Sequence, residues 1–569
     1  MLTALSVLLL LLFYVITPAA ASGWFYAGAA KVDITPPLEH PLPLGGKGGM
    51  STGLHHNPAY IGYASDPDRL YARALAISWG GTDLVLVALD STGTELDQLQ
   101  AVRNAVSKKL GIDAANLIIS STHTHNAPDI QGVFGGFIPS LCLPPPEGLG
   151  YCATHYLEQI VIPGIIKAAE DAYMSRERAI LKVGQVQTKG LVFNRRTWTP
   201  ENRKSGIIDP ELTVLQFAKK TTHHEVIATL VNFSVHMVPA VGSHLISADA
   251  SGYLVAKLEK HYGGVGLFVP GAIGNHNPSP YFNAVAPYPY VSNDPNLAYA
   301  PYGTIWDDNP GNPYQYPNDP AWDILDPQKR ILRSCWDATE EYAQKLAHNA
   351  IRALDHKGKS FNQPNLKVEK SIVTLPLENV AYVMICLPMN DPVKVEARKG
   401  TWGPTLAFLA SSQAPRTVYT NTCGANPVPF PFNGQCYWLD TEVFVVKIGP
   451  VAFATVPGEL FIETQLVLKS KLPGFGFVVG LAPEALGYIA PTHYIDAYWD
   501  EELMEHYGPI PDFDYWGSKG PDDYESRLQA VTSGTGLMTK ELLEALLPMI
   551  HQIKDDKDDR DDRQNRHQD

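Results

Sequence analysis

The sequence has little charge, few cysteines and no long apolar run beyond its N-terminal segment. Asp, Glu, Lys and Arg make up only 18% of the 569 residues, and no basic stripe occurs that could follow a phosphate backbone. Nucleic acid is therefore not an expected partner. The six cysteines include no C-x-x-C pair, which argues against a cysteine-based zinc site. Apolar residues make up 45% of the chain, enough for a sizeable core.

The N-terminus has the pattern of a secretory signal peptide. An apolar run at residues 5–16 is followed by Pro18 and by small residues that form an A-x-A cleavage site near Ala21. No Lys or Arg precedes the run, so an uncleaved anchor helix is the alternative, although the run is short for a membrane span. We expect residues 1–21 to be a signal peptide and the protein to be secreted or retained in the secretory pathway.

An even number of cysteines in an exported chain predicts disulfide bonds. Pairing of Cys142 with Cys152, and of Cys423 with Cys436, would close short loops. The one glycosylation sequon that could make the chain a glycoprotein, at Asn232, lies within an apolar strand-like run. We expect this asparagine to be buried and unused.

Short apolar runs rich in β-branched residues alternate with helical patterns along the chain. This alternation predicts a mixed α/β (α+β) domain whose mostly buried sheet is flanked by helices. The expected strands are residues 84–89, 117–121, 226–235, 267–269, 443–448 and 451–455, and the expected helices are residues 97–110 and 156–174.

The main domain is expected to span residues 22–540. Within it, residues 278–327 are dense in Pro, Asn, Asp and Tyr, which is typical either of a functional lid or of an irregular surface excursion. Residues 541–569 are expected to hold most of an amphipathic terminal helix (539–553) and a charged, solvated tail.

Two histidines follow one of the expected strands directly. The strand at residues 117–121 runs into His123-Thr-His125, and residues two apart on a strand point to the same side. Sites on open α/β sheets lie at such strand ends, and neutral imidazole is a common zinc ligand. Taken alone, the H-x-H pattern fits structural histidines equally well.

Two further candidate ligands also follow apolar strands. His236 comes after the strand at 226–235, and Glu459 comes after the strand at 451–455 and a Pro-Gly turn. A catalytic zinc needs about three protein ligands and an open position for water, so a carboxylate would complete the two imidazoles. The alternative for Glu459 is a residue that complements the dipole of the following helix, and a lone histidine such as His236 is usually structural.

Four motifs, in this order, resemble the neutral ceramidases. They are T-H-T-H at 122–125, V-H at 235–236 followed by L-I-S-x-D-x-x-G-Y at 245–253, V-P-G-E at 456–459, and T-H-Y at 492–494. Segments 27–36, 70–74, 194–195 and 209–212 are also similar. The likeness covers about residues 28–507, and so residues 22–540 resemble the catalytic domain of that family.

The resemblance implies an activity and a ligand set. It implies one zinc ion per chain, held by His123, His236, Glu459 and Tyr494, and hydrolysis of the N-acyl bond of ceramide by metal-activated water. His125 would stand beside the metal and assist proton transfer or hold the oxyanion. Arg195 would contact the substrate. The expected partner is a lipid-like or small amide substrate, with membrane contact only through that substrate, and the sequence does not indicate an oligomeric state.

The chain departs from the family pattern at the wall that would face the substrate. The family's G-D-V-S-P-N segment is here residues 274–279, where Asn275 replaces the aspartate and Asn277 replaces the serine. The Asn277 amide can donate a hydrogen bond to an oxyanion but cannot act as a hydroxyl. Only 75 residues follow Tyr494, so the family's C-terminal immunoglobulin-like domain is not expected.

Three functions remain open at this stage. The first is a zinc amidohydrolase acting on ceramide or a related N-acyl lipid. The second keeps the metal but acts on another amide, ester or lactone, such as a secondary metabolite, or catalyses a non-hydrolytic reaction. The third is a pseudoenzyme that retains the metal and only binds lipid. Asn277 favours the last two over the first, whereas retention of all four ligands and of His125 argues against the third.

Overall fold

The structure is a computed structural model of the chain. It describes residues 23–46, 49–134, 142–145, 148, 150–194, 207–241, 243–279, 335–377, 384, 387–399, 417–421, 436–491, 498–507 and 537–554. The signal segment, most of the Pro- and Tyr-rich segment and the charged tail lie outside these residues.

A large mixed sheet forms the first half of the fold. In the described part of the chain it has nine strands in the order β11-β9-β8-β6-β1-β3-β4-β5, with β13 paired to β6. Most neighbours are antiparallel, but β4 runs parallel to β5, and β9 runs parallel to β11. The strands are β1 (Tyr26–Asp33), β3 (Tyr71–Trp79), β4 (Thr82–Leu89), β5 (Leu117–Ser121), β6 (Glu177–Gln187), β8 (Glu211–Lys219), β9 (Val226–Phe233), β11 (Val265–Pro270) and β13 (Lys359–Phe361).

A second sheet packs against the first. Its described strands follow the order β14-β16-β17-β19, with β15 paired to β16, and β17 runs parallel to β19. They are β14 (Leu366–Leu377), β15 (Tyr419–Asn421), β16 (Cys436–Ile448), β17 (Val451–Thr455) and β19 (Phe475–Val479). Three short pairs, β2 (Gly53–Leu54) with β10 (Leu245–Ile246), β7 (Val192–Asn194) with β12 (His276–Pro278), and β18 (Glu459–Leu460) with β20 (Tyr488–Ile489), lie outside both sheets.

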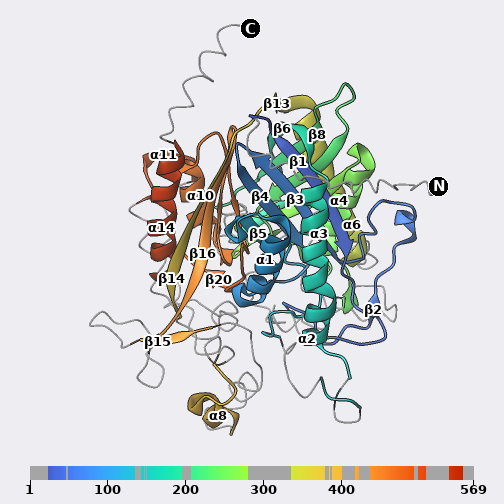
Figure 1. The fold of residues 1–569 in the computed structure, drawn as a ribbon, viewed down its shortest axis with the longest axis vertical. Helices are drawn as coiled ribbons and strands as arrows, with labels where there is room; N and C mark the ends of the chain where they lie inside the picture. The colour runs from blue at the N-terminus through green and yellow to red at the C-terminus, as the bar shows by residue number, and fades with distance from the viewer. Residues whose placement is uncertain are drawn as a thin grey trace, which may run out of the picture.

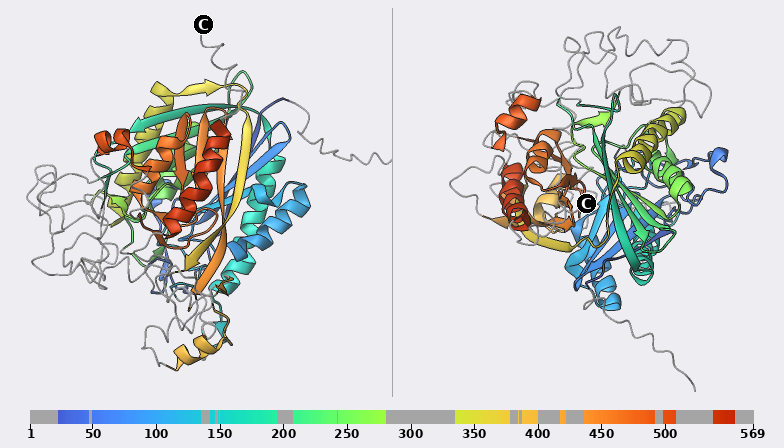
Figure 2. Two further views of the ribbon diagram at one scale, coloured as in Figure 1. Left: turned by 90° about the vertical axis from the view of Figure 1, so that its left-hand side faces the viewer. Right: turned by 90° about the horizontal axis from the view of Figure 1, so that it is seen from above.

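Helices cover the outer faces of both sheets, so the molecule has four layers (Figures 1 and 2). Leu75, Leu86 and Phe444 belong to the core between the sheets, and this apolar interface accounts for the strongly apolar strands. The helices on the first sheet are α1 (Leu96–Leu110), α2 (Ala153–Tyr156) continued through a π-helical turn (Leu157–Val161) into α3 (Ile162–Met174), α4 (Asp249–Tyr262) and α6 (Cys335–Lys357). The second sheet carries α10 (Ile462–Lys471), α11 (Glu501–Tyr507) and α14 (Leu537–Lys554), while α8 (Pro392–Arg398) lies at the periphery.

Buried polar side chains join the two sheets near the ends of β5 and β9. The Ser120 hydroxyl donates to the Gly480 carbonyl at 3.0 Å, and the Asn232 amide donates to the carbonyls of Val269 and Val478 at 3.1 and 2.8 Å. The sequon asparagine is thus buried, as the sequence predicted. These contacts hold β19 against the ends of two strands that precede candidate ligands.

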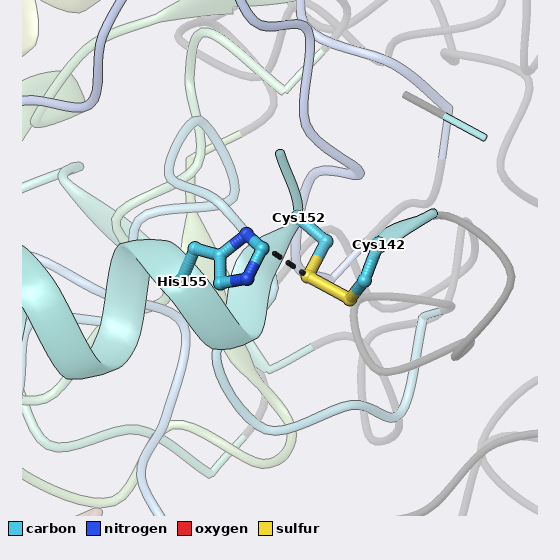
Figure 3. Close-up of a disulfide and its surroundings, with 3 residues drawn as sticks. All are labelled: Cys142, Cys152 and His155. Carbon is cyan, nitrogen blue, oxygen red and sulfur yellow. Dashed lines mark hydrogen bonds between the residues drawn. A yellow bond between two sulfur atoms is a disulfide. The ribbon is translucent and has the colours of Figure 1, made fainter. Parts of the chain in front are cut away.

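One disulfide bond lies within the described residues. Cys142 and Cys152 are bonded beside the start of α2, and the sulfur of Cys152 contacts His155 (Figure 3). Cys436 is also disulfide-bonded, but Cys423, its expected partner, lies outside the described residues. Cys335 is buried and is not part of a disulfide bond. The first expected pairing is confirmed.

The expected fold class is confirmed, with refinements at several boundaries. The strands predicted at 117–121 and 451–455 match β5 and β17, whereas the strand predicted at 226–235 ends at Phe233, before the chain turns toward His236. Helix α14 begins at Leu537 and buries Leu542, Leu546 and Ile550 in the core of the second sheet. No helix in the described ranges has the length and hydropathy of a membrane span.

Candidate metal centre

Three of the predicted zinc ligands meet at one buried point. His123 follows β5, His236 follows β9, and Glu459 begins β18, shortly after β17. All three are less than 9% exposed. The histidines come from two strands of the first sheet and the glutamate from beyond the second sheet, so the site lies where the two halves of the fold join.

The donor atoms are spaced as a tetrahedral metal requires. The His236 Nε2 and a Glu459 carboxylate oxygen are 3.1 Å apart, and the His123 Nε2 and the same oxygen are 3.6 Å apart. Ligand atoms bound at about 2.0–2.1 Å to one tetrahedral zinc lie about 3.3 Å from one another. These residues therefore fit a divalent metal such as zinc.

Backbone carbonyls fix the orientation of both predicted histidine ligands. The Nδ1 of His123 lies 2.7 Å from the Thr92 carbonyl, and the Nδ1 of His236 lies 2.7 Å from the Ile273 carbonyl. Each carbonyl can only accept, so each Nδ1 carries the hydrogen and each Nε2 presents its lone pair to the site. Such outer-shell bonds are typical of metal-binding histidines.

His125 stands beside these ligands and adds a third imidazole. Its Nε2 lies 3.1 Å from the His123 Nε2, and one nitrogen from each of His123, His125 and His236 falls in a group no more than 4.8 Å across. Gly46, in the left-handed region at φ 75°, packs so tightly on the His125 ring that a Cβ there would be 2.4 Å from the ring. Glycine at this position therefore permits the observed place of the imidazole.

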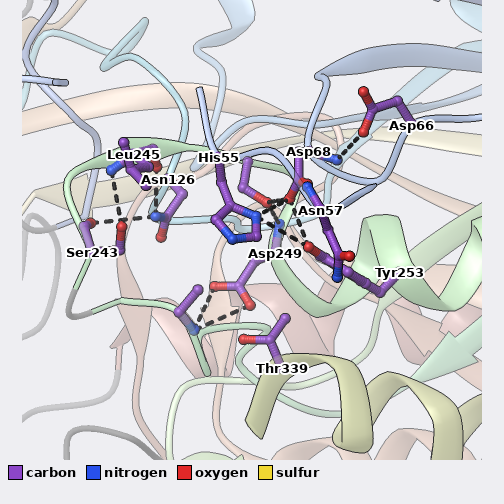
Figure 4. A network of polar contacts seen from close by, with 12 residues as sticks. His55, Asn57, Asp66, Asp68, Asn126, Ser243, Leu245, Asp249, Tyr253 and Thr339 are labelled. Carbon is purple, nitrogen blue, oxygen red and sulfur yellow. Dashed lines mark hydrogen bonds and ion pairs between the residues drawn. The ribbon is translucent and has the colours of Figure 1, made fainter. Parts of the chain in front are cut away.

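The L-I-S-x-D-x-x-G-Y motif ties the two histidine loops together (Figure 4). Ser247 donates its backbone N–H to Asn126 and accepts from the Thr124 hydroxyl through its own carbonyl. Asp249, at φ 53°, accepts from the Ala240 N–H in the loop after His236. The motif thus supports the site without entering it.

The buried carboxylate of Asp68 holds this motif in place through hydrogen bonds. Asp68 is fully buried and accepts from the hydroxyls of Tyr253 and Ser247, at 2.8 and 3.2 Å (Figure 4). Its Oδ1 also lies 2.8 Å from the Nδ1 of His55. Four polar groups, counting the Asn57 N–H, satisfy this carboxylate, which explains how it is accommodated in the interior.

The segment that departs from the family pattern passes beside Glu459. A Cβ on Gly274 would be 2.4 Å from the Glu459 carbonyl. Asn275 donates to both oxygens of Glu463, whose pKa is raised by burial. Burial lowers the pKa of His276 to about 4. The side-chain oxygen of Asn277 is buried and has no hydrogen-bond partner among the described residues.

The structure brings four of the seven predicted site residues together, places Asn277 on β12, and leaves two untested. His123, His125, His236 and Glu459 converge, whereas Arg195 and Tyr494 lie outside the described residues. The sequence analysis missed Thr92 and Gly46. A backbone carbonyl such as that of Thr92 cannot be recognised from a sequence pattern. The Gly45-Gly46 pair, in contrast, is typical of a backbone that passes close to other groups, and it could have indicated a position near the site.

Comparison with known proteins supports the resemblance to neutral ceramidases. Residues 52–272 match the family model of the N-terminal part of neutral/alkaline non-lysosomal ceramidase, and this match contains His123, His125 and His236 but not Glu459. No curated protein sequence matches the chain significantly.

Solved ceramidase structures share the fold over most of the chain. Neutral ceramidase from Pseudomonas aeruginosa aligns with a TM-score of 0.54 at 15% identity, covering 93% of this chain and 75% of that one. A ceramidase complexed with C2 aligns with a TM-score of 0.56 at 16% identity, covering 94% and 76%. The predicted resemblance is confirmed, by sequence over residues 52–272 and by fold over most of the chain.

Proposed function

We propose that this protein is a zinc-dependent hydrolase that cleaves the N-acyl amide bond of ceramide or of a related N-acyl lipid. The observation that carries the proposal is the convergence of His123, His236 and Glu459, with both imidazoles held by backbone carbonyls so that their Nε2 atoms face one point. The similarity of fold and sequence to ceramidases supports the substrate class.

Different residues are proposed to bind the metal, to transfer the proton and to contact the substrate. His123, His236 and Glu459, with Tyr494 as a proposed fourth ligand, would hold the zinc. A zinc ion there supplies Lewis-acid activation of water and of the scissile carbonyl. His125 lies next to these residues, with its Nε2 3.1 Å from the His123 Nε2, and is the group proposed to give a proton to the leaving amine. Arg195 is proposed to contact the substrate.

Asn277 favours a second candidate, in which the same metal site acts on a different amide, ester or lactone. Its buried side-chain oxygen has no partner among the described residues, so it is available to accept from a donor on the substrate. A serine at this position would offer a shorter side chain with a hydroxyl. The segment that passes beside Glu459 therefore differs from the family pattern in both shape and polarity at this position.

The location of the protein is also a proposal. We propose that it acts outside the cell or within the secretory pathway, with the N-terminal segment as its signal. The Cys142–Cys152 disulfide supports an oxidising compartment.

The test combines metal analysis with turnover. Zinc content is measured in the purified wild-type protein, in His236→Ala, and in His261→Ala as a control at an exposed histidine of α4. Release of fatty acid from a fluorescent ceramide is then followed with and without chelator, in the wild type and in Asn277→Ser.

The outcomes separate the candidates. One zinc per chain, lost in His236→Ala but not in His261→Ala, together with chelator-sensitive ceramide hydrolysis, supports the first candidate. Zinc without ceramide turnover, and turnover gained in Asn277→Ser, supports the second. Absence of zinc from the wild type under zinc-replete conditions overturns both.

A further inference from the structure

A buried ion pair lies on two inner strands of the first sheet, beside the segment whose carbonyls accept from His123. Arg73, on β3, donates through Nη1 to Asp90, the residue directly after β4, and both residues are 2% exposed. Residues two apart on a strand share a face, so Arg73 points to the same side as Leu75, whose side chain lies in the core between the sheets. A charged pair in this position needs an explanation.

Stability does not supply that explanation. The Nε and Nη2 atoms of Arg73 are buried and have no hydrogen-bond partner among the described residues, although the guanidinium lies 4.5 Å from the centre of the Tyr71 ring. Taking two charges out of water is costly, and an incompletely bonded pair recovers less of that cost. Replacing a buried ion pair with apolar residues of similar volume is often neutral or stabilising.

The Asp90 carboxylate instead connects two segments that shape the metal centre. One oxygen accepts from the Tyr71 N–H at 2.9 Å and from Arg73, and the other accepts from the Thr122 hydroxyl at 3.3 Å. Thr122 immediately precedes the predicted ligand His123. Arg73 therefore reaches the ligand-bearing loop through a single carboxylate.

His123 needs such support because its backbone is strained. It has φ 64°, in the left-handed region that non-glycine residues rarely adopt. Its N–H donates to the Ser91 carbonyl at 2.9 Å and its Nδ1 to the Thr92 carbonyl at 2.7 Å. Both carbonyls belong to the two residues after Asp90, so the position of Asp90 sets the position of both acceptors.

We infer that Arg73 and Asp90 are positioning residues for the metal centre, retained to hold residues 90–92 and Thr122 where His123 can present its Nε2 to the ion. The inference rests on the metal site of the proposed function. Neither side chain touches the metal or the substrate. Loss of the pair should therefore weaken metal binding more than it weakens the fold.

A matched pair of double variants tests this separation. Arg73→Met/Asp90→Leu replaces the pair with apolar side chains. Arg103→Met/Glu442→Leu does the same to another buried pair, which joins α1 to β16. Glu442 also pairs with Lys370, whose side chain is 26% exposed and can be solvated in the variant, and Arg103 also donates to the Leu117 carbonyl at the start of β5. Zinc affinity is measured by competition with a chromogenic chelator, and folding is measured by circular dichroism during thermal unfolding.

We expect both double variants to unfold within a few degrees of the wild type. The first should bind zinc about 10- to 100-fold more weakly, the range seen when outer-shell partners of metal ligands are removed, and the second should bind zinc as the wild type does. Unchanged zinc affinity in a folded Arg73→Met/Asp90→Leu protein overturns the inference and leaves the proposed function standing. An equal loss of affinity in the control pair also overturns it.

If the first double variant does not fold, the zinc affinity of Thr122→Val tests the inference instead. This change removes only the hydroxyl that reaches Asp90. A several-fold loss of zinc affinity with an unchanged unfolding temperature supports the inference, and unchanged affinity overturns it. A wild-type protein that binds no zinc overturns the proposed function and this inference together.

Discussion

Replacing Gly46 with alanine should damage catalysis while leaving the metal in place. The new Cβ would lie 2.4 Å from both Cγ and Nδ1 of His125, whereas carbon atoms pack at about 3.5 Å, so the ring must move by about 1 Å. A misplacement of about 1 Å in a catalytic constellation can cost about 10²-fold in rate. We expect turnover of the accepted substrate to fall by about that factor, with zinc content unchanged because His125 is not a predicted ligand.

Gly111→Ala is the matched control for this experiment. Gly111 ends α1 with φ 69°, close to the φ of Gly46, and a Cβ there would meet no atom within 4 Å. Both variants carry the left-handed backbone penalty of about 1–2 kcal/mol, but only Gly46→Ala contacts the imidazole. Equal turnover in the two variants would refute the reasoning. Loss of zinc in Gly46→Ala would instead show that His125 binds the metal.

Two further predictions concern the buried polar groups around the site. Burial lowers the pKa of His276 from 6.5 to about 4. As the pH falls from 6.5 to 4, this imidazole is therefore protonated in the unfolded chain but stays neutral in the folded chain. His276 should then reduce the unfolding free energy by about 1.4 kcal/mol per pH unit across that range, and chemical denaturation of His276→Gln at pH 7 and pH 4 should show a weaker pH dependence than the wild type. Asn232→Ala removes two buried hydrogen bonds to carbonyls and should lower the unfolding free energy, measured by chemical denaturation, by about 2–4 kcal/mol. Because Asn232 is buried, glycosidase treatment of the exported wild-type protein should leave its mass unchanged. A glycan on Asn232 would contradict this and show that the strand is exposed during maturation.

The sequence predicted the parts of this molecule that short apolar runs encode. The strands predicted at 117–121 and 451–455 match β5 and β17. A short, continuous apolar run rich in β-branched residues is typical of a buried strand in a packed domain. The same runs gave the position of His123 and Glu459 at strand ends. Local pattern was therefore enough to nominate candidate ligands, whereas the ligand set itself came from the resemblance to the neutral ceramidases.

The pairing of the sheets could not be predicted in this way. Nothing local distinguishes a strand covered by helices on both faces from one that packs on a second sheet, since both are apolar throughout. Strands such as β6 and β8 mix polar and apolar residues and were not recognised. The support from Thr92, Asp90 and Asp68 is equally invisible, because these groups act through backbone geometry and contacts between distant segments.

The origin of the proposed ligands in different sheets has a consequence for the stability of the whole fold. His123 and His236 follow strands of the first sheet, while Glu459 follows β17 of the second, so an ion bound to all three cross-links the two halves of the core. A ligand that binds only the folded chain stabilises it by about 4 kcal/mol at a thousandfold excess over its Kd. That free energy acts where Ser120 and Asn232 already join the sheets. In the metal-free protein, only the direct His123–Glu459 and His236–Glu459 contacts would add to the hydrogen bonds of Ser120 and Asn232 at this junction. A bound metal is thus expected to stabilise the packing of the two sheets as well as to take part in catalysis.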